Sequence, residues 1–155
     1  LTFDTQIGLL DAEYDEFADA RFTSFGGSRA FQTPAFSPRL TARYAVQYVA
    51  DIPGGGDVTF GAAAQFRSRM ALAVDNTAVN SNIELPGMFQ EDYWLFDARV
   101  AWNDPSGRYS VGVYGQNILN ETYRTDAQEF SSVGNIRTVY YGAPQTWMLK
   151  LSARY

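Results

Sequence analysis

The sequence of 155 residues contains no cysteine and no histidine. The lack of cysteine excludes a disulfide framework, a thiolate nucleophile and zinc sites built on cysteine. The lack of histidine excludes Ser-His-Asp and Cys-His catalysis and metal sites with imidazole ligands. Few classes of enzyme work without both residues. We therefore expect that the protein is not an enzyme, and we expect no cofactor.

Positive charge and long apolar runs are also scarce. The chain has 12 Lys and Arg against 17 Asp and Glu, a net charge of −5. It shows no basic stripe of the kind that nucleic-acid-binding proteins carry, so nucleic acid is not an expected partner. No run of about 18 apolar residues is present, which excludes a transmembrane helix. A transmembrane β-strand remains open, because its apolar residues alternate with polar ones.

Aromatic residues, in contrast, are abundant, with 10 Tyr, 11 Phe and 3 Trp. The apolar fraction of 46% is that of an ordered protein, and the length suits a single domain over residues 1–155. So many rings require a large buried or membrane-interfacial surface.

Apolar and polar residues alternate in six segments, as they do in strands whose side chains point to opposite faces of a sheet. In the last segment Trp147, Leu149 and Leu151 share one face, and Lys150 and Ser152 share the other. The segments are residues 3–9, 38–48, 58–69, 93–102, 108–116 and 146–155. No segment has a helical period. The pattern predicts an all-β fold, an antiparallel up-and-down meander of about six long strands.

The connections between these segments alternate in length. Residues 51–57 (DIPGGGD) and 103–107 (NDPSG) have the composition of tight turns. The other three connections, residues 15–37, 70–92 and 117–145, are long. Short periplasmic turns and long extracellular loops are typical of bacterial outer-membrane barrels. We therefore interpret the sheet as a curved segment of a transmembrane β-barrel.

Aromatic residues near the strand ends support this interpretation, because their amphipathic rings favour both membrane interfaces. Tyr48, Trp102 and Tyr109 fall toward the periplasmic ends, and Trp94 and Trp147 fall at the outer ends. The lipid bilayer is then an expected partner. A soluble β-sandwich or a lipocalin-like barrel with one buried face would show the same alternation. It would not explain the unequal connections.

Three stretches resemble a known family, the TonB-dependent outer-membrane receptors, in the C-terminal part of their barrel. YGQNILNETYR (114–124) is similar to the motif of the family's penultimate strand, an aromatic-Gly-x-Asn-Leu-x-Asn/Asp-x-x-Tyr run. YGAPQTWMLKLSARY (141–155) is similar to the closing strand with its aromatic last residue, and TPAFSPRLTARY (33–44) to a weaker lead into an earlier strand. Ile118 replaces the usual Leu, and Gln145 stands where a basic residue often follows the Pro.

The resemblance implies location in the bacterial outer membrane and energy-coupled uptake of a scarce nutrient, such as a ferric siderophore, cobalamin or a glycan. Receptors of this family have a plug domain and a barrel of about 22 strands, of which this chain matches roughly the final quarter. The implied partners are the rest of the barrel, its plug, TonB acting indirectly through that plug, and the outer-membrane assembly machinery. That machinery is implied to read the alternate closing residues Leu149, Leu151, Ala153 and Tyr155.

Two other functions remain open: a passive outer-membrane porin or small barrel, and a soluble β ligand-binding module. The predicted inward face carries charges at Arg43, Arg67, Arg69, Asp97, Arg99, Lys150 and Arg154. We interpret them as a wet, salt-bridged lumen wall that contacts a plug. The alternative is a path for an anionic solute such as a ferric chelate.

Two further patterns have a structural and a functional interpretation. The Gly54–Gly56 run could hold a phosphate, but it lies in a short turn before a strand and lacks a Lys-Ser/Thr partner, which favours a turn. The acidic residues Asp11, Glu13, Asp15, Glu16 and Asp19 could ligate calcium through oxygen atoms. We favour the interpretation that these residues lie at the solvated end of the first strand and in the loop that follows it.

Overall fold

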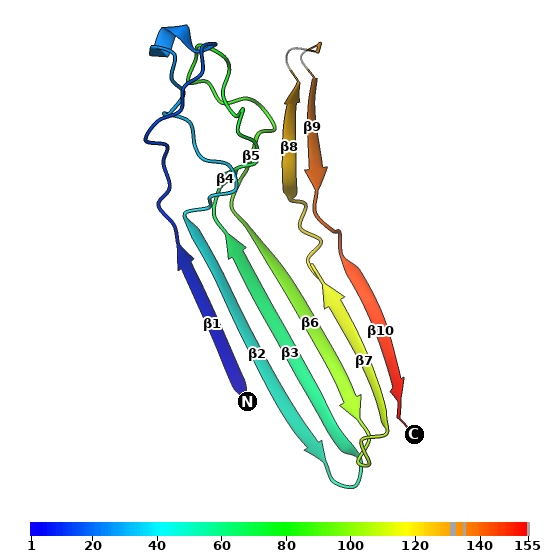
Figure 1. Cartoon of the computed structure of the whole chain (residues 1–155). Helices are drawn as coiled ribbons and strands as arrows, with labels where there is room; N and C mark the ends of the chain where they lie inside the picture. The colour runs from blue at the N-terminus through cyan, green and yellow to red at the C-terminus, as the bar shows by residue number, and fades with distance from the viewer. Residues whose placement is uncertain (131–132, 135, 155) are drawn as a thin grey trace.

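The fold is dominated by one antiparallel sheet of six strands in the order β1-β2-β3-β6-β7-β10 (Figure 1). A computed structural model describes residues 1–130, 133–134 and 136–154. The strands are β1 (Thr2–Leu9), β2 (Leu40–Ile52), β3 (Gly56–Arg67), β6 (Tyr93–Asn103), β7 (Tyr109–Gln116) and β10 (Thr146–Ala153). The predicted all-β, antiparallel meander is confirmed. Among the described residues, no helix is long and apolar enough to cross a membrane.

The strand register places the apolar positions of all six strands on one face. Thr5 lies opposite Tyr44, and the same row continues across the sheet through Ala64 and Phe96. On the far side Val100 pairs with Val113, which pairs with Leu149. A slip of one residue would turn a strand's apolar side chains to the opposite face. The pairing therefore aligns the apolar positions of all six strands on one face of the sheet and the polar positions on the other.

The glycine run between β2 and β3 forms a tight turn. Gly54 and Gly56 have φ angles of +72° and +85°, which favour glycine. A Cβ on Gly56 would lie 1.9 Å from the backbone oxygen of Asn103. The ladder extends to the pair Ile52–Gly56, so both strands are longer and the turn is shorter than expected. This geometry accounts for the glycines without a phosphate.

The three long connections contain regular structure that the sequence analysis did not predict. The second holds the short pair β4 (Met70–Ala71) and β5 (Phe89–Gln90), and the third holds the hairpin of β8 (Arg124–Phe130) and β9 (Ile136–Tyr141). A 3₁₀ turn, η1 (Thr23–Phe25), lies in the first. Two-residue strands are too short to show a period. β8 reads RTDAQEF and has no apolar alternation.

The buried core lies in these connections and not on the sheet. Leu72 and Met88 are both 0% exposed, and they pack with Met70, Ala71, Phe89 and Ala127. Val139 of β9 covers the same cluster. Of the buried apolar residues in the described part of the chain, Tyr93 alone belongs to the six-stranded sheet.

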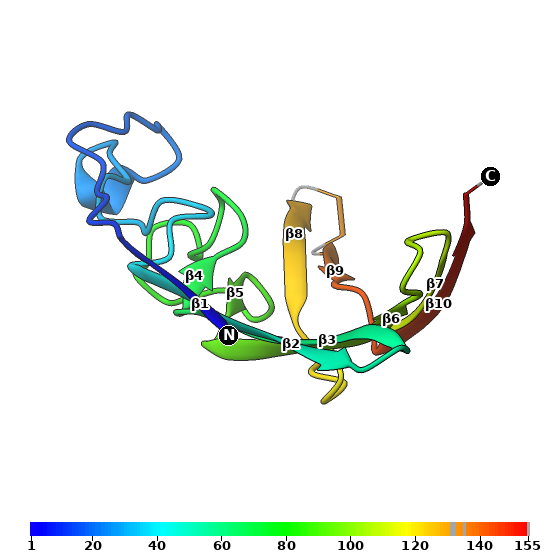
Figure 2. The ribbon, with the colours of Figure 1, turned by 90° about the horizontal axis from the view of Figure 1, so that it is seen from below.

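The sheet is curved, and the long connections gather over its concave side (Figure 2). A hollow of about 370 Å³ is lined largely by residues of the polar face, among them Asp4, Arg43, Gln47 and Arg99. The polar face is therefore the concave one and the apolar face the convex one. The accessible surface is 10129 Å², whereas a compact monomer of this mass has about 7,800 Å².

Candidate functional site

The convex face is a continuous apolar surface with no protein layer against it among the described residues. Its large side chains are exposed, with Leu149 at 65% and Leu151 at 69%. Trp94 gathers an aromatic cluster there, with ring centroids 5.0 Å from Phe66, 6.0 Å from Phe96 and 6.4 Å from Tyr44. An exposed apolar surface that spans a whole sheet indicates a partner for that face.

The five aromatic residues expected at the two membrane interfaces all lie on this face. Trp94 and Trp147 are the second residues of β6 and β10, at the ends that meet the long connections. Trp102 and Tyr109 flank the short connection from β6 to β7, and Tyr48 lies four residues before the end of β2. The Trp102 Nε1–H donates a hydrogen bond of 2.7 Å to the Gly55 backbone oxygen. The rings therefore lie toward both ends of the sheet.

The residues implied as an assembly signal form one row on the last strand. Leu149, Leu151 and Ala153 lie opposite Val113, Val111 and Tyr109 of β7, and all three point to the convex face. Tyr155 lies outside the described residues. Within the described sheet β10 is an edge strand, so its outer backbone groups are available to a further strand.

The concave face carries six of the seven charged residues that were expected there. The Arg43 guanidinium donates a hydrogen bond of 3.0 Å to Asp4, and Gln65 donates one of 3.3 Å to Asp97. Arg99 lies across Gly61, where a Cβ would be 2.7 Å from its Nε, and it donates to Gln47. Arg67 and Lys150 lie opposite Tyr93 and Gly112, and Arg154 follows β10 in the same register. In the described sheet, amide side chains pair with these charges more often than opposite charges do.

Arg69, the seventh charged residue, lies two residues beyond the end of β3 and contacts the second long connection. It forms ion pairs with Glu84 and with Glu91, the latter at 3.1 Å, and its guanidinium lies 4.2 Å above the Phe89 ring. The hydrogen bond with Glu84 is the main reason that the pKa of Arg69 is raised. The predicted strand ends two residues after β3 does, so Arg69 lies in the connection that follows the strand.

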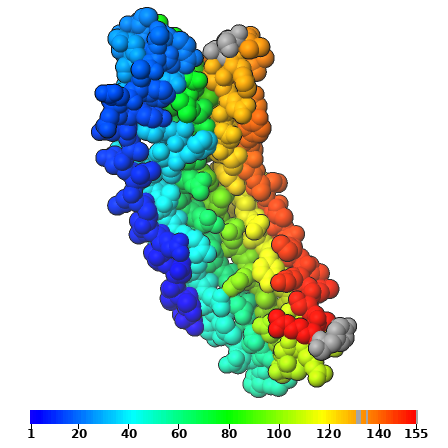
Figure 3. Space-filling model, in the orientation of Figure 1, coloured from blue at the N-terminus to red at the C-terminus, as the bar shows by residue number. Residues whose placement is uncertain are grey.

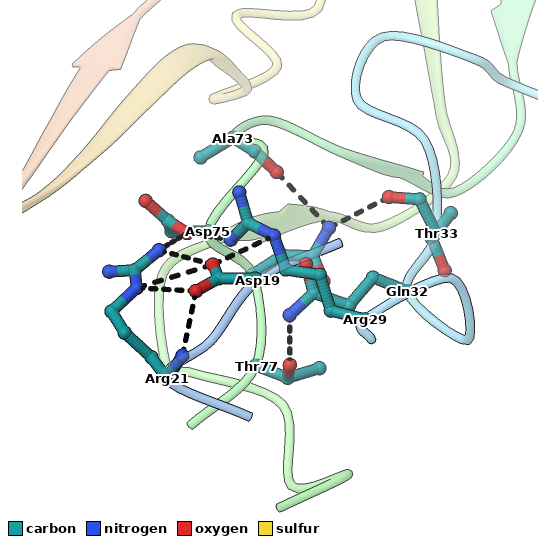
Figure 4. Close-up of polar contacts among 9 residues, drawn as sticks. Asp19, Arg21, Arg29, Gln32, Thr33, Ala73, Asp75 and Thr77 are labelled. Atoms are coloured by element: carbon teal, nitrogen blue, oxygen red, sulfur yellow. Dashed lines mark hydrogen bonds and ion pairs between the residues drawn. The ribbon is translucent and has the colours of Figure 1, made fainter. Parts of the chain in front are cut away.

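A cluster of ion pairs joins the first long connection to the second (Figure 4). Arg29, which is 6% exposed, pairs with Asp75 and lies 3.3 Å from Asp19. Arg21 holds the same Asp19 at 2.7 Å. Hydrogen bonds from the Arg21 side chain and backbone lower the pKa of Asp19 from 3.8 to about 2. We call Asp19, Arg21, Arg29 and Asp75 the loop clamp.

Amide side chains extend the contact between these two connections. Gln32 donates to Thr77, and the Asn76 Nδ2 donates to the Thr33 backbone oxygen at 2.8 Å. In the space-filling view the two connections form one mass, and the β8–β9 hairpin stands beside it (Figure 3). The three long connections therefore form a packed unit at one end of the sheet, which we call the loop unit.

The acidic residues near the first strand do not gather around a common point. Asp19 is held by two arginines, and Asp11 pairs with Arg39 at 3.4 Å on the surface. Among the described residues, no group of three or more acidic side chains is placed to hold a metal ion.

The motif at residues 114–124 forms a junction between the sheet and the β8–β9 hairpin. The backbone N–H of Asn117 donates to Asp97 at 3.0 Å. The Asn117 side chain donates to the backbone oxygens of Glu121 and Ala143, at 2.8 and 3.1 Å, and accepts from the Glu121 N–H at 2.8 Å. One amide thus connects β7 to the segment that leads into β10.

Tyr123 completes this junction through two ring contacts. It stacks on Tyr93, with ring centroids 4.9 Å apart. A Cβ on Gly142 would lie 2.0 Å from the same ring. Tyr123 of residues 114–124 therefore packs on Gly142 of residues 141–155. Neither stretch of sequence predicts this contact by itself.

Comparisons of the chain with protein-family models, with curated proteins and with solved structures find no match.

Proposed function

We propose that the chain is part of the wall of an outer-membrane β-barrel, the C-terminal part of a TonB-dependent receptor that takes up a scarce nutrient. The observation that carries this proposal is the distribution of polarity across the curved sheet. Polar residues line the concave face, and apolar residues cover the convex face. Soluble barrels of small size fill their interior with apolar side chains, whereas outer-membrane barrels have the reverse arrangement.

The length of the three central strands supports the same proposal, whereas β1, β7 and β10 contain 8 residues each. β2, β3 and β6 contain 13, 12 and 11 residues, and a tilted transmembrane strand needs about 9–11. The surplus allows these strands to extend beyond the hydrocarbon layer. The polar hollow beside Arg43 and Arg99 then faces the lumen, where a plug or water satisfies its side chains.

In this proposal, the loop unit formed by the three long connections is the surface that first meets the substrate. Its first two connections are held together by the loop clamp, and its third packs on the Leu72–Met88 core through Val139. Binding surfaces that are already ordered lose less conformational entropy when a ligand binds. The receptor then captures its substrate with a preformed vestibule, and the plug rearrangement follows.

Uptake with and without the protonmotive force tests the proposed function. The complete receptor is produced in cells, its place in the outer membrane is checked, and accumulation of labelled candidate nutrients is measured. An energised receptor stops accumulating its substrate when an uncoupler is added. Uncoupler-insensitive entry would indicate a passive porin, and recovery of the receptor in the soluble fraction would indicate a soluble ligand-binding module.

We also propose the outer-membrane assembly machinery as a partner, which binds the closing strand by strand addition. Backbone hydrogen bonds supply affinity in this mode, and alternate side chains supply specificity. The Tyr155→Asp receptor should insert less well than the Arg154→Asp receptor, because Arg154 belongs to the polar register. The heat-modifiable folded fraction measures insertion. Equal insertion of both variants would remove Tyr155 from the signal.

A further inference from the structure

The turn that follows β7 presents two apolar residues for which the proposed uptake has no use. Leu119 is 68% exposed, and Ile118 precedes it in a segment otherwise made of polar residues. An exposed leucine alone is unremarkable on a protein surface. The direction of this turn and the way it is held make the pair informative.

The turn lies on the apolar side of the sheet. Gly115 is opposite Trp147 and Ala98, so a Cβ on it would point to the convex face. That Cβ would lie 2.7 Å from Ile118 Cγ2 and 2.6 Å from the Trp147 ring. Both side chains therefore occupy the convex face over Gly115. Figure 2 shows the segment after β7, in yellow, projecting beyond this face.

Several hydrogen bonds anchor the backbone of the turn. Asn117 and Asn120, on either side of the pair, have φ angles of +48° and +55°. The Ile118 N–H donates to the Phe96 oxygen at 2.8 Å, and the Gln145 side chain donates to the Ile118 oxygen at 2.8 Å. The Gln145 N–H donates to the Asn120 side chain at 3.0 Å. Because these bonds anchor the backbone, Ile118 and Leu119 stay at the tip of the turn.

We propose that Ile118 and Leu119 form a fixed apolar wedge that enters the outer interface of the lipid bilayer beside Trp147. This inference rests on the proposed membrane location of the sheet. It selects lipid as the partner because the wedge is continuous with the convex apolar face through Gly115 and Trp147. Trp147 is 58% exposed at the same edge, and Trp is enriched at membrane interfaces. Apolar side chains beside such rings bury themselves at the boundary of headgroups and acyl chains.

Depth-dependent fluorescence quenching tests the wedge. Single cysteines replace Leu119, Val111 and Ser110 in the complete receptor, freed of any other cysteine, and each carries a small environment-sensitive fluorophore. The receptor is reconstituted into phosphatidylcholine vesicles with a spin label high or low on the acyl chain. Heat modifiability confirms that each labelled variant has folded.

The expected result is at least twofold stronger quenching at Leu119 by the shallow spin label than by the deep one. The label at Val111, on the convex face within β7, should show the opposite preference, and the label at Ser110 should respond to neither. If Val111 responds and Leu119 behaves like Ser110, the wedge is overturned while the membrane wall stands. If neither Val111 nor Leu119 responds, the proposed membrane location fails and the wedge fails with it.

Discussion

At the scale of single residues, one buried amide does most to shape the junction between wall and hairpin. Asn117 is 5% exposed, and its side chain makes three hydrogen bonds while its backbone has a positive φ. Asparagine tolerates this conformation better than most residues do, and its amide both donates and accepts. Aspartate lacks the donors, and glycine lacks the side chain. The chemistry of the site therefore requires asparagine.

Replacing Gly142 with alanine tests the fit between Tyr123 and the segment before β10. The added methyl group would overlap the Tyr123 ring, and we expect the unfolding free energy of the complete protein to fall by about 1–3 kcal/mol. In a Tyr123→Ala background the same change should cost less than about 0.5 kcal/mol. Denaturant titrations of the four proteins measure the coupling. Equal costs in both backgrounds would show that the ring does not occupy this position.

The loop clamp should weaken only in strong acid. The pKa of Asp19 is about 2 in the folded protein and 3.8 ordinarily, so its stabilising contribution is complete above 3.8 and is lost as the pH falls through 2. Thermal midpoints of the protein and its Asp19→Asn variant should differ at pH 5 and converge by pH 2. The Asp11→Asn variant is the control, since the Asp11–Arg39 pair is exposed and contributes little. A constant difference from pH 5 to pH 2 would contradict the clamp.

At the scale of elements, strand faces could be predicted from the sequence because side-chain direction depends only on position along a strand. Each strand's single apolar face excludes a register slip of one residue, but a slip of two residues keeps the same faces, so the exact register could not be predicted. Contacts between distant segments could not be predicted, because Arg29 and Asp75 lie in segments with no period. The β8–β9 hairpin was missed for the same reason. Its inner residues Ala127 and Val139 are recognisable only through the core they cover.

Charge should be tolerated on one face of β7 only. Val111→Arg in the complete receptor should cost about 2–4 kcal/mol if that position is near the bilayer midplane, whereas Ser110→Arg should cost much less. Leu151→Arg and Ser152→Arg on β10 form the matched pair, since they lie opposite those two residues. Unfolding free energies in lipid or detergent provide the measurement. Equal penalties on the two faces would indicate a core on each side of the sheet.

At the scale of the whole molecule, the polarity of the two faces and the curvature of the sheet together indicate how the sheet is used. The sequence pattern predicted that the polar face points inward, and the curvature places this face on the concave side. The location of the core was not foreseen, because the residues around Leu72 and Met88 have no strand or helix period. A sheet with an exposed apolar face, next to connections that have their own buried core, fits the proposed barrel wall with an ordered vestibule.

The isolated chain should therefore depend on detergent. In water its convex face and the unpaired edges of β1 and β10 would be exposed, and such surfaces drive aggregation. We expect size-exclusion chromatography of the 155-residue chain without detergent to give large aggregates. A single monomer peak with cooperative unfolding would be incompatible with a lipid-facing sheet.

The central claim, that the convex face meets lipid and the concave face meets water, is tested most directly by spin-label accessibility along β7. Labels placed one at a time from residue 109 to residue 114 of the reconstituted receptor are exposed to oxygen, which partitions into lipid, and to a polar nickel chelate. We predict that positions 109, 111 and 113 are most accessible to oxygen and that positions 110, 112 and 114 are most accessible to nickel. Accessibility without a period of two, or with the opposite phase, would contradict the account.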